Sequence, residues 1–163
     1  MQTRFQRHLL STSPIRSAVA CGLAIALAGT VHAEGPQAAL PMMQLNAGIH
    51  LIQAEVASSF QTRATGLMYR KTMPANQGML FVFPAVEQHC MWMKNTLLPL
   101  SVAFIEADGT IANVEDMEPR TEISHCSVKP TRFALEMNKG WFAQKGIKPG
   151  TKLGGIDKAP QPR

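Results

Sequence analysis

Short apolar runs separated by polar, glycine and proline residues dominate the chain after residue 48. Some runs alternate between apolar and polar positions and others are apolar throughout, and both patterns are typical of β-strands. Asp108-Gly109 lies between two runs and favours a tight hairpin, because a type I′ turn needs positive φ at both central positions. The predicted strands are Ile49–Ala57, Met79–Phe83, Val102–Ala107, Thr110–Glu115, Arg132–Met137 and a short segment near Thr151–Leu153.

One segment has helical periodicity instead. Its apolar residues predict a short amphipathic helix over residues 59–70. Ser58 and Gln61 match a capping box, in which each side chain satisfies a free backbone N–H group. A helical turn is also predicted over Trp141–Lys145, and its two aromatic residues are expected to cover the core. One short helix with short strands and connections predicts an α+β fold, mainly antiparallel β, with a small, partly closed, barrel-like sheet.

The first 33 residues have the features of a secretion signal. Arg4, Arg7 and Arg16 precede an uncharged apolar run, and Val31-His32-Ala33 has small residues at the two positions that a signal peptidase reads. The run is shorter than the roughly 20 apolar residues of a comfortable membrane span. We therefore expect cleavage near Ala33, a periplasmic or secreted location, and no transmembrane segment in the mature chain.

Removal of this leader changes the charge of the protein. Three of the 16 Lys and Arg residues and none of the 11 Asp and Glu residues lie within it, so the formal charge falls from +5 to +2. A charge this small, without a clustered basic stripe, argues against nucleic acid as a partner. The predicted organisation is a signal peptide over residues 1–33, a linker over 34–47, a single domain over 48–153 and a flexible tail over 154–163.

Two cysteines, Cys90 and Cys126, remain in the mature chain. An even number of cysteines in an oxidising compartment predicts a disulfide. Each cysteine follows a histidine, so His89, Cys90, His125 and Cys126 form an alternative ligand set for copper or zinc. Adjacent residues of a strand point to opposite faces, which argues against both members of a pair reaching one ion. A cysteine nucleophile activated by a histidine is a third interpretation, and no cofactor is expected.

The stretch from His89 to Ile105 contains most of the remaining candidate chemistry. It combines an aromatic ring, a cation, an amide and a hydroxyl group in one strand and turn, which suits a concave site for a small polar ligand. Arg70, at the end of the predicted helix, and Glu136, in a later strand, are expected to complete this site. The predicted ligand-binding residues are Arg70, Trp92, Lys94, Asn95, Thr96 and Glu136.

A structural interpretation of the same residues competes with the ligand site. In it, Trp92 packs in the core, and Asn95 and Thr96 bond the backbone of their own turn. Arg70 then pairs with Glu136 instead of meeting a ligand. Alanine at Trp92 and Asn95 distinguishes the two interpretations, because it should abolish binding in the first and only lower the melting temperature in the second.

Five sequence motifs occur in an order that resembles a known family. They are TRATGLMYR (Thr62–Arg70), GMLFVF (Gly78–Phe83), MWMKNTLLPLSVAFI (Met91–Ile105), DGTI (Asp108–Ile111) and FALEMNKG (Phe133–Gly140). Together they resemble the prokaryotic family called domain of unknown function 192, over roughly Asn46 to Leu153. The resemblance implies a compact, mainly β domain, often exported, without an established activity. The family typically has Pro-Leu-Asp where this chain has Pro99-Leu100-Ser101.

These observations predict a non-enzymatic exported domain that binds a small polar ligand or an envelope protein around Trp92–Thr96. The alternative is an envelope metal-handling protein that uses the two His-Cys pairs. Thiol content distinguishes the two functions, because a disulfide removes both sulfur ligands.

Overall fold

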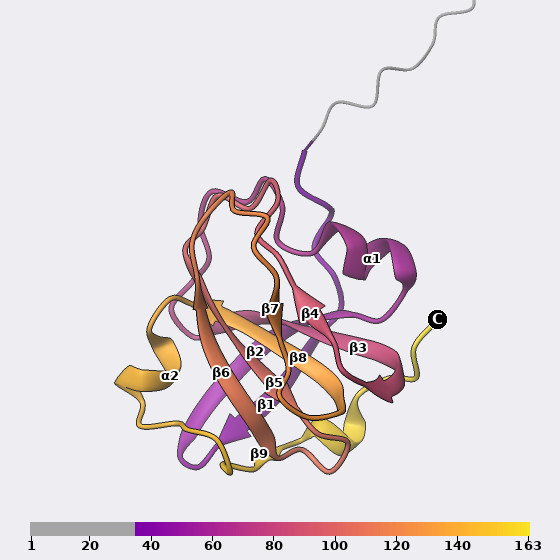
Figure 1. Cartoon of the computed structure of the whole chain (residues 1–163), viewed down its shortest axis with the longest axis vertical. Helices are drawn as coiled ribbons and strands as arrows, with labels where there is room; N and C mark the ends of the chain where they lie inside the picture. Colours follow the sequence, from indigo (N-terminus) through magenta and orange to yellow (C-terminus); the bar gives the residue numbers. More distant parts are fainter. Residues whose placement is uncertain (1–34) are drawn as a thin grey trace, which may run out of the picture. The chain divides into compact units, whose positions relative to one another are not determined.

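The computed structural model describes residues 35–163, so the predicted leader lies outside the described residues (Figure 1). The strands are β1 (Met42–Ala47), β2 (His50–Ala57), β3 (Gln77–Glu87), β4 (Cys90–Met91), β5 (Leu100–Ile105), β6 (Ile111–Met117), β7 (His125–Cys126), β8 (Thr131–Asn138) and β9 (Leu153–Gly154). The helices are α1 (Phe60–Thr65), α2 (Trp141–Gln144) and the 3-10 helix η1 (Ile156–Lys158). None of the helices in this part of the chain has the length and apolar character of a membrane span.

Seven of the described strands form one curled sheet in the order β6-β5-β8-β3-β2-β1-β9, and β4 pairs with β7 in a separate ladder (Figure 1). Neighbouring strands are antiparallel except β2 and β3. The hairpin predicted at Asp108-Gly109 joins β5 to β6. Its turn is not the predicted type I′ turn, because Gly109 has positive φ, at +92°, and Asp108 does not. The segments that lead into β6 and β9 meet where Thr110 pairs with Lys152, and the Leu153 N–H donates to the Gly109 carbonyl at 2.9 Å. The predicted α+β fold with a partly closed, barrel-like sheet is confirmed.

Each face of the sheet carries a hydrophobic cluster, because alternate residues of a strand point to opposite faces. Along β8, Phe133 joins the first cluster and Ala134 joins the second. Trp141 and Phe142 of α2 belong to the first cluster, so the prediction that they cover the core is confirmed. The second cluster receives Leu67 from the segment after α1, together with side chains from β4 and the turn that follows it.

The structure extends the sheet into both predicted flanking segments. Residues 42–47, predicted as part of a linker, form β1 and pair with β2, because Leu45 and Ala47 alternate into the core. Within the predicted tail, Gly154 pairs with Asn46 and Ile156 of η1 is buried. The prolines at either end predicted irregular chain, but the short apolar alternations inside those segments are enough for edge pairing.

Helix α1 is shorter than predicted and its cap lies one residue later. Ser59 Oγ accepts from the Thr62 N–H at 3.1 Å, and Thr62 Oγ1 accepts from the Ser59 N–H at 3.1 Å. The capping box predicted at Ser58 and Gln61 is therefore wrong. Ser58 is buried beyond the end of β2, and its carbonyl accepts bonds from other segments. Gly66, at φ +51°, ends the helix well before residue 70.

Candidate functional site

A cavity of about 210 Å³ lies beside α1, on the face of the sheet that carries the second cluster. Strand β3 contributes two phenylalanines to its wall, and the segment after α1 contributes two further apolar side chains. The apolar lining includes Phe60, Leu67, Met68, Phe81, Phe83, Met91 and Trp92. Pockets that combine apolar and aromatic walls with a few placed polar groups are typical sites for small organic molecules.

Glu136 of β8 also lines this cavity, although only 4% of its surface is exposed. In register, it lies between Met79 of β3 and Val102 of β5, so apolar side chains flank its carboxyl group. No residue in the described part of the chain pairs with this carboxyl group. Burial raises the pKa of Glu136 to about 8, because desolvation disfavours the charged form. A buried ionisable group with a shifted pKa at a cavity is a candidate functional residue.

Glu136 is the middle member of a row of three glutamates that crosses the sheet. Glu55 on β2 and Glu115 on β6 each lie two strands away from it, in register. Arg70 pairs with Glu55, and His125 pairs with Glu115. Within residues 35–163, Glu136 is therefore the member of this row that has no charged partner.

Arg70 forms a two-point ion pair with Glu55, at 2.5 Å from Nη1 to Oε1 and 2.7 Å from Nη2 to Oε2. The interpretation that Arg70 pairs with Glu136 is therefore wrong. Burial raises the pKa of Glu55, but hydrogen bonds from Arg70 and from the Leu40 N–H, with the Arg70 charge, outweigh it and leave this pKa below its ordinary value. Arg70 does not line the cavity. Sequence reasoning missed Glu55 because no local pattern sets the register of β2 against β3.

Two loops joined by hydrogen bonds fix one wall of the cavity. Tyr69 and Asn95 both have positive φ, at +62° and +54°. The Tyr69 N–H donates to the Asn95 carbonyl at 2.9 Å, and Asn95 Nδ2 donates to the Tyr69 hydroxyl at 2.7 Å. Thr96, which lines the cavity, donates to the Lys94 carbonyl at 3.3 Å. Thr96 thus bonds its own turn as the structural interpretation predicts, whereas the Asn95 side chain bonds a different loop.

Two exposed aromatic side chains border the cavity. Trp92 is 49% exposed and Phe60 is 78% exposed. The interpretation that packs Trp92 in the core is therefore wrong. Lys94 Nζ lies 5.5 Å from the centroid of the Trp92 ring, within the range of a cation–π contact. Phe60 is one of the apolar residues whose spacing predicted the amphipathic helix, but periodicity does not show which apolar residues of a short helix are left uncovered.

The structure brings together part of the predicted site. Trp92, Thr96 and Glu136 line the cavity, whereas Lys94 and Asn95 lie in the adjoining turn outside it. A ligand role for each of these residues stays a prediction. The cavity also includes Arg63, which sequence reasoning missed.

Arg63 has a structural role at the end of β2. Its Nη1 donates to the Ser58 carbonyl at 2.6 Å and to the Val82 carbonyl at 3.1 Å. Strand β3 continues there after β2 has ended, so the guanidinium supplies donors to carbonyls that have lost a strand partner. Burial lowers the pKa of Arg63.

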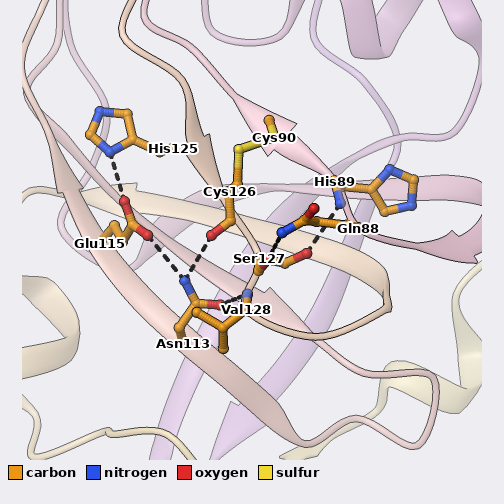
Figure 2. Close-up of a disulfide and its surroundings, with 9 residues drawn as sticks. All are labelled: Gln88, His89, Cys90, Asn113, Glu115, His125, Cys126, Ser127 and Val128. Atoms are coloured by element: carbon orange, nitrogen blue, oxygen red, sulfur yellow. Dashed lines mark hydrogen bonds and ion pairs between the residues drawn. A yellow bond between two sulfur atoms is a disulfide. The ribbon is translucent and has the colours of Figure 1, made fainter.

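Cys90 and Cys126 form a disulfide with an S–S distance of 2.04 Å, and this prediction is confirmed (Figure 2). The bond joins β4 to β7, and Cys90 lines the cavity. The next residue, Ser127, continues the attachment: its Oγ accepts from the His89 N–H at 3.1 Å, and its carbonyl accepts from Gln88 Nε2 at 2.8 Å. The disulfide ladder is thus part of the frame of the cavity.

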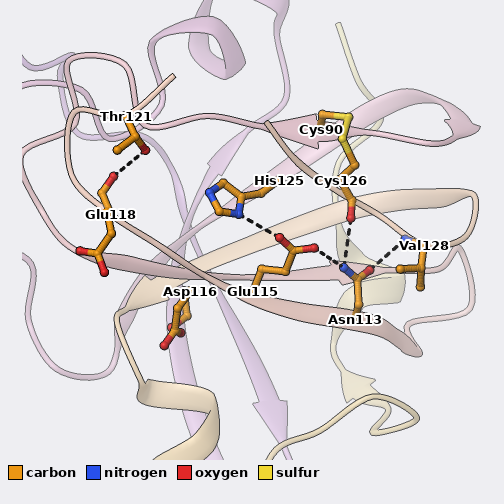
Figure 3. Close-up of polar contacts among 10 residues, drawn as sticks. Cys90, Asn113, Glu115, Asp116, Glu118, Thr121, His125, Cys126 and Val128 are labelled. Atoms are coloured by element: carbon orange, nitrogen blue, oxygen red, sulfur yellow. Dashed lines mark hydrogen bonds and ion pairs between the residues drawn. A yellow bond between two sulfur atoms is a disulfide. The ribbon is translucent and has the colours of Figure 1, made fainter. Parts of the chain in front are cut away.

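A polar network fastens β7 to β6 beside the disulfide (Figures 2 and 3). His125 Nδ1 lies 2.8 Å from Glu115 Oε2. Asn113 Nδ2 donates to Glu115 Oε1 at 3.2 Å and to the Cys126 carbonyl at 3.1 Å. Figure 3 shows Asp116 directed away from this network, as expected for neighbouring residues of a strand.

The alternative copper or zinc set is not assembled. Both sulfurs are used in the disulfide. His89 stacks on Phe83 with ring centroids 3.7 Å apart, whereas His125 contacts Glu115. In the described part of the chain, no three His, Cys, Asp or Glu side chains are grouped so that they could hold a metal ion.

Comparison with known proteins identifies the family. The DUF192 family, described as "Uncharacterized ACR", matches residues 43–155. The chain belongs to the DUF192 family. The resemblance inferred from the five motifs is confirmed, and no curated protein matches the chain.

Two solved structures share the DUF192 fold seen here. A protein of Sinorhizobium meliloti 1021, named as a candidate transcription regulator, is 35% identical with a TM-score of 0.67, over 72% of this chain and 95% of that chain. A protein of unknown function from Novosphingobium aromaticivorans DSM 12444 is 30% identical with a TM-score of 0.66, over 70% of this chain and 85% of that chain. At 35% and 30% identity, both proteins resemble this chain in sequence as well as in fold. Neither of their names assigns a ligand.

Ser101, at the position where the family resemblance implied an aspartate, lies outside the cavity. Its Oγ donates to Asp116 and accepts from the Gly140 N–H at 2.8 Å. In register it lies beside Met137, whose side chain joins the first cluster, on the face opposite Glu136. The substitution therefore leaves the cavity lining of this DUF192 protein unchanged.

Reduction of the disulfide should destabilise this DUF192 protein by about 3 kcal/mol. The bond joins residues 36 positions apart, and its loss raises the entropy of the unfolded chain. Urea unfolding with and without dithiothreitol measures the effect, and the double variant Cys90→Ser/Cys126→Ser should match the reduced protein and show no response to reductant. An unchanged urea midpoint on reduction would contradict the prediction.

Proposed function

We propose that this DUF192 protein is an exported, non-enzymatic domain that binds a small organic molecule in the cavity beside α1. The observation that carries the proposal is Glu136, a buried carboxyl group without a partner in the described chain, on the wall of a cavity that also has aromatic and aliphatic side chains in its lining. A buried polar group usually has a hydrogen-bond partner. A ligand that supplies this partner would account for the group.

The size and lining of the cavity fit one small ligand. An apolar cavity of about 150 Å³ is enough for benzene, so about 210 Å³ accommodates an aromatic ring with a short polar substituent. Phe81 and Leu67 are each 2% exposed and give a buried apolar wall, while Trp92 remains available near the solvent. The cavity therefore makes the predicted class of ligand more specific: a small molecule with an apolar body and a polar head group.

Binding is favoured over catalysis by the groups around Glu136. Among the described residues that line the cavity there is no histidine, lysine or second carboxylate, and the Cys90 and Cys126 sulfurs form a disulfide. General acid–base or nucleophilic chemistry usually needs a second group positioned beside the first.

Export is supported by two independent features of the chain. The leader has the charge pattern and small residues of a secretion signal. Cys90 and Cys126 form a disulfide, a bond that persists in oxidising compartments. The mass of the protein recovered from the periplasm tests the proposal, since cleavage after Ala33 should remove the first 33 residues. A protein that keeps its full length in the cytoplasm would contradict it.

Small aromatic probes test the cavity. Benzylamine, benzyl alcohol and benzoate should include at least one binder at millimolar concentration, and its amide NMR shifts should concentrate at Leu67, Thr96 and Glu136. Ala64→Phe should block this binding, because Ala64 lines the cavity. Gln61→Phe is the matched control, since Gln61 is an exposed position of the same helix that does not line it. Failure of all three probes to shift these amides, or equal binding by both variants, refutes the proposal.

A further inference from the structure

We infer that the cavity selects an organic ammonium, whose cationic head group meets Glu136 while its apolar body contacts the aromatic walls. This inference rests on the proposed function, because it names the ligand class of the same cavity. The head group is assigned from the charges around Glu136, and the body is assigned from the wall composition.

Of the three glutamates in the row, Glu136 is the one without a charged partner among the described residues. On one side along the row, Glu55 is held by Arg70, and on the other side Glu115 is held by His125. Among the described residues that line the cavity, Glu136 is the one that can become an anion. A ligand cation at this point would give Glu136 a basic partner, as Arg70 gives Glu55 and His125 gives Glu115.

Two cationic side chains in or beside the cavity, Arg63 and Lys94, are engaged elsewhere. Val82, whose carbonyl binds Arg63, pairs in register with Phe133, three positions along β8 from Glu136. At roughly 3.3 Å per residue, this places the Arg63 attachment about 10 Å away along the strand. The guanidinium also has carbonyl partners of its own. Lys94 lies over Trp92 and is exposed, outside the lining.

The walls suit a cation with an apolar body. Four lining side chains are aromatic, and two of them, Phe81 and Phe83, come from alternate positions of β3 and so share one face. Aromatic faces attract ammonium groups through the negative face of the ring. When Glu136 is ionised, its carboxylate attracts a cation and has no proton to donate to a neutral acceptor.

The assignment predicts how affinity changes with pH. An ammonium binds the ionised carboxylate, and burial gives Glu136 a pKa of about 8, so the proton must leave before the cation enters. Affinity should therefore rise about tenfold per pH unit well below 8 and level off above it. A neutral head group that accepts a hydrogen bond from the protonated acid would show the opposite trend, with affinity falling above pH 8.

The test compares benzylamine with benzyl alcohol, which has a similar body and no charge. NMR titrations should show benzylamine affinity rising about tenfold from pH 6 to 7 and about fivefold from pH 7 to 8, where half of Glu136 is already ionised. At pH 8 benzylamine should bind at least about tenfold tighter than benzyl alcohol. Glu136→Gln should remove both the preference and the pH dependence. Glu115→Gln, in the same row but outside the lining, should retain both. Amide spectra of each variant confirm that it is folded.

Each other outcome overturns a defined part of the assignment. Equal binding of the two probes, or retention of the benzylamine preference in Glu136→Gln, overturns the ammonium assignment and leaves the small-molecule cavity standing. Absence of binding by either of them and by benzoate refutes the proposed function itself. Nα-acetyl-lysine amide carries a free side-chain ammonium group. If it binds more tightly than benzylamine, the assignment of a free small molecule is overturned in favour of a lysine side chain of a protein partner.

Discussion

Glu136→Gln should stabilise the protein by roughly 3 kcal/mol at pH 7 and by about 4 to 5 kcal/mol at pH 9. Glu136 is 4% exposed, and burial raises its pKa to about 8. At pH 7 the folded protein therefore keeps a proton that the unfolded chain, with a glutamate pKa near about 4.3, has already released. A glutamine of similar shape is neutral in both states and avoids this difference.

The sign follows from proton binding in the two states. Between the unfolded pKa of about 4.3 and the folded value of about 8, the native state binds more protons than the unfolded state, so stability falls as pH rises. This contribution is fully present below the unfolded pKa and is lost as pH rises through the folded one. Its slope is about 1.4 kcal/mol per pH unit. Glu136→Gln should remove that slope.

Urea unfolding of both proteins at pH 5, 7 and 9 measures this effect, since the difference between them cancels the titration of other groups. The matched control is Glu55→Gln, an identical change on the same face of the sheet. Glu55 accepts from Arg70 and from the Leu40 N–H, so glutamine there should destabilise the protein. Equal stability of Glu136→Gln and the unmodified protein at pH 9 would show that Glu136 is not held protonated.

A gain in stability at Glu136 would bear on function. Binding sites often retain groups that destabilise the fold, and their replacement commonly stabilises a protein while removing its activity. Loss of benzylamine binding in the same variant that gains stability would distinguish a ligand site from a structural residue. Removing the charge of a structural glutamate, such as Glu55, should instead lower the stability of the protein.

Local sequence patterns predicted the features that depend on neighbours along the chain. Asp108-Gly109 gave the hairpin between β5 and β6 because the turn geometry is set within a few residues. The Cys90–Cys126 bond followed from an even cysteine count in an oxidising compartment. Trp92, Thr96 and Glu136 were selected for their chemistry, and the structure places all three on one cavity.

The remaining features depend on strand register and on what covers each surface. Glu55 and Glu136 share a row because β2, β3 and β8 pair in one particular register, and a shift of one residue would move either side chain to the other face. No sequence pattern specifies that shift. The exposure of Phe60 likewise depends on which segments pack against α1, and helical spacing does not predict those segments.

Arg70→Met should destabilise the protein by about 3 to 5 kcal/mol, the cost typical of leaving one charge of a buried pair without its partner. Glu55 is 7% exposed and accepts two bonds from Arg70, at 2.5 and 2.7 Å. The Leu40 N–H remains as a donor, but it carries no charge to balance the carboxylate. Chemical unfolding at pH 7 measures the loss.

The double variant Glu55→Met/Arg70→Met separates the cost of an unpaired charge from the value of the pair. Replacing both members with apolar side chains leaves no buried charge, so most of the lost stability should return. Lys129→Ala serves as the control, because it breaks an exposed pair with Glu106 and should change stability by less than about 1 kcal/mol. The pKa of Glu55 is lowered in the fold, so its contribution is present above the unfolded pKa and is lost as pH falls through the folded one. If Arg70→Met costs no more than Lys129→Ala, the ion pair contributes little, and the tether it provides between β2 and the loop after α1 must come from packing instead.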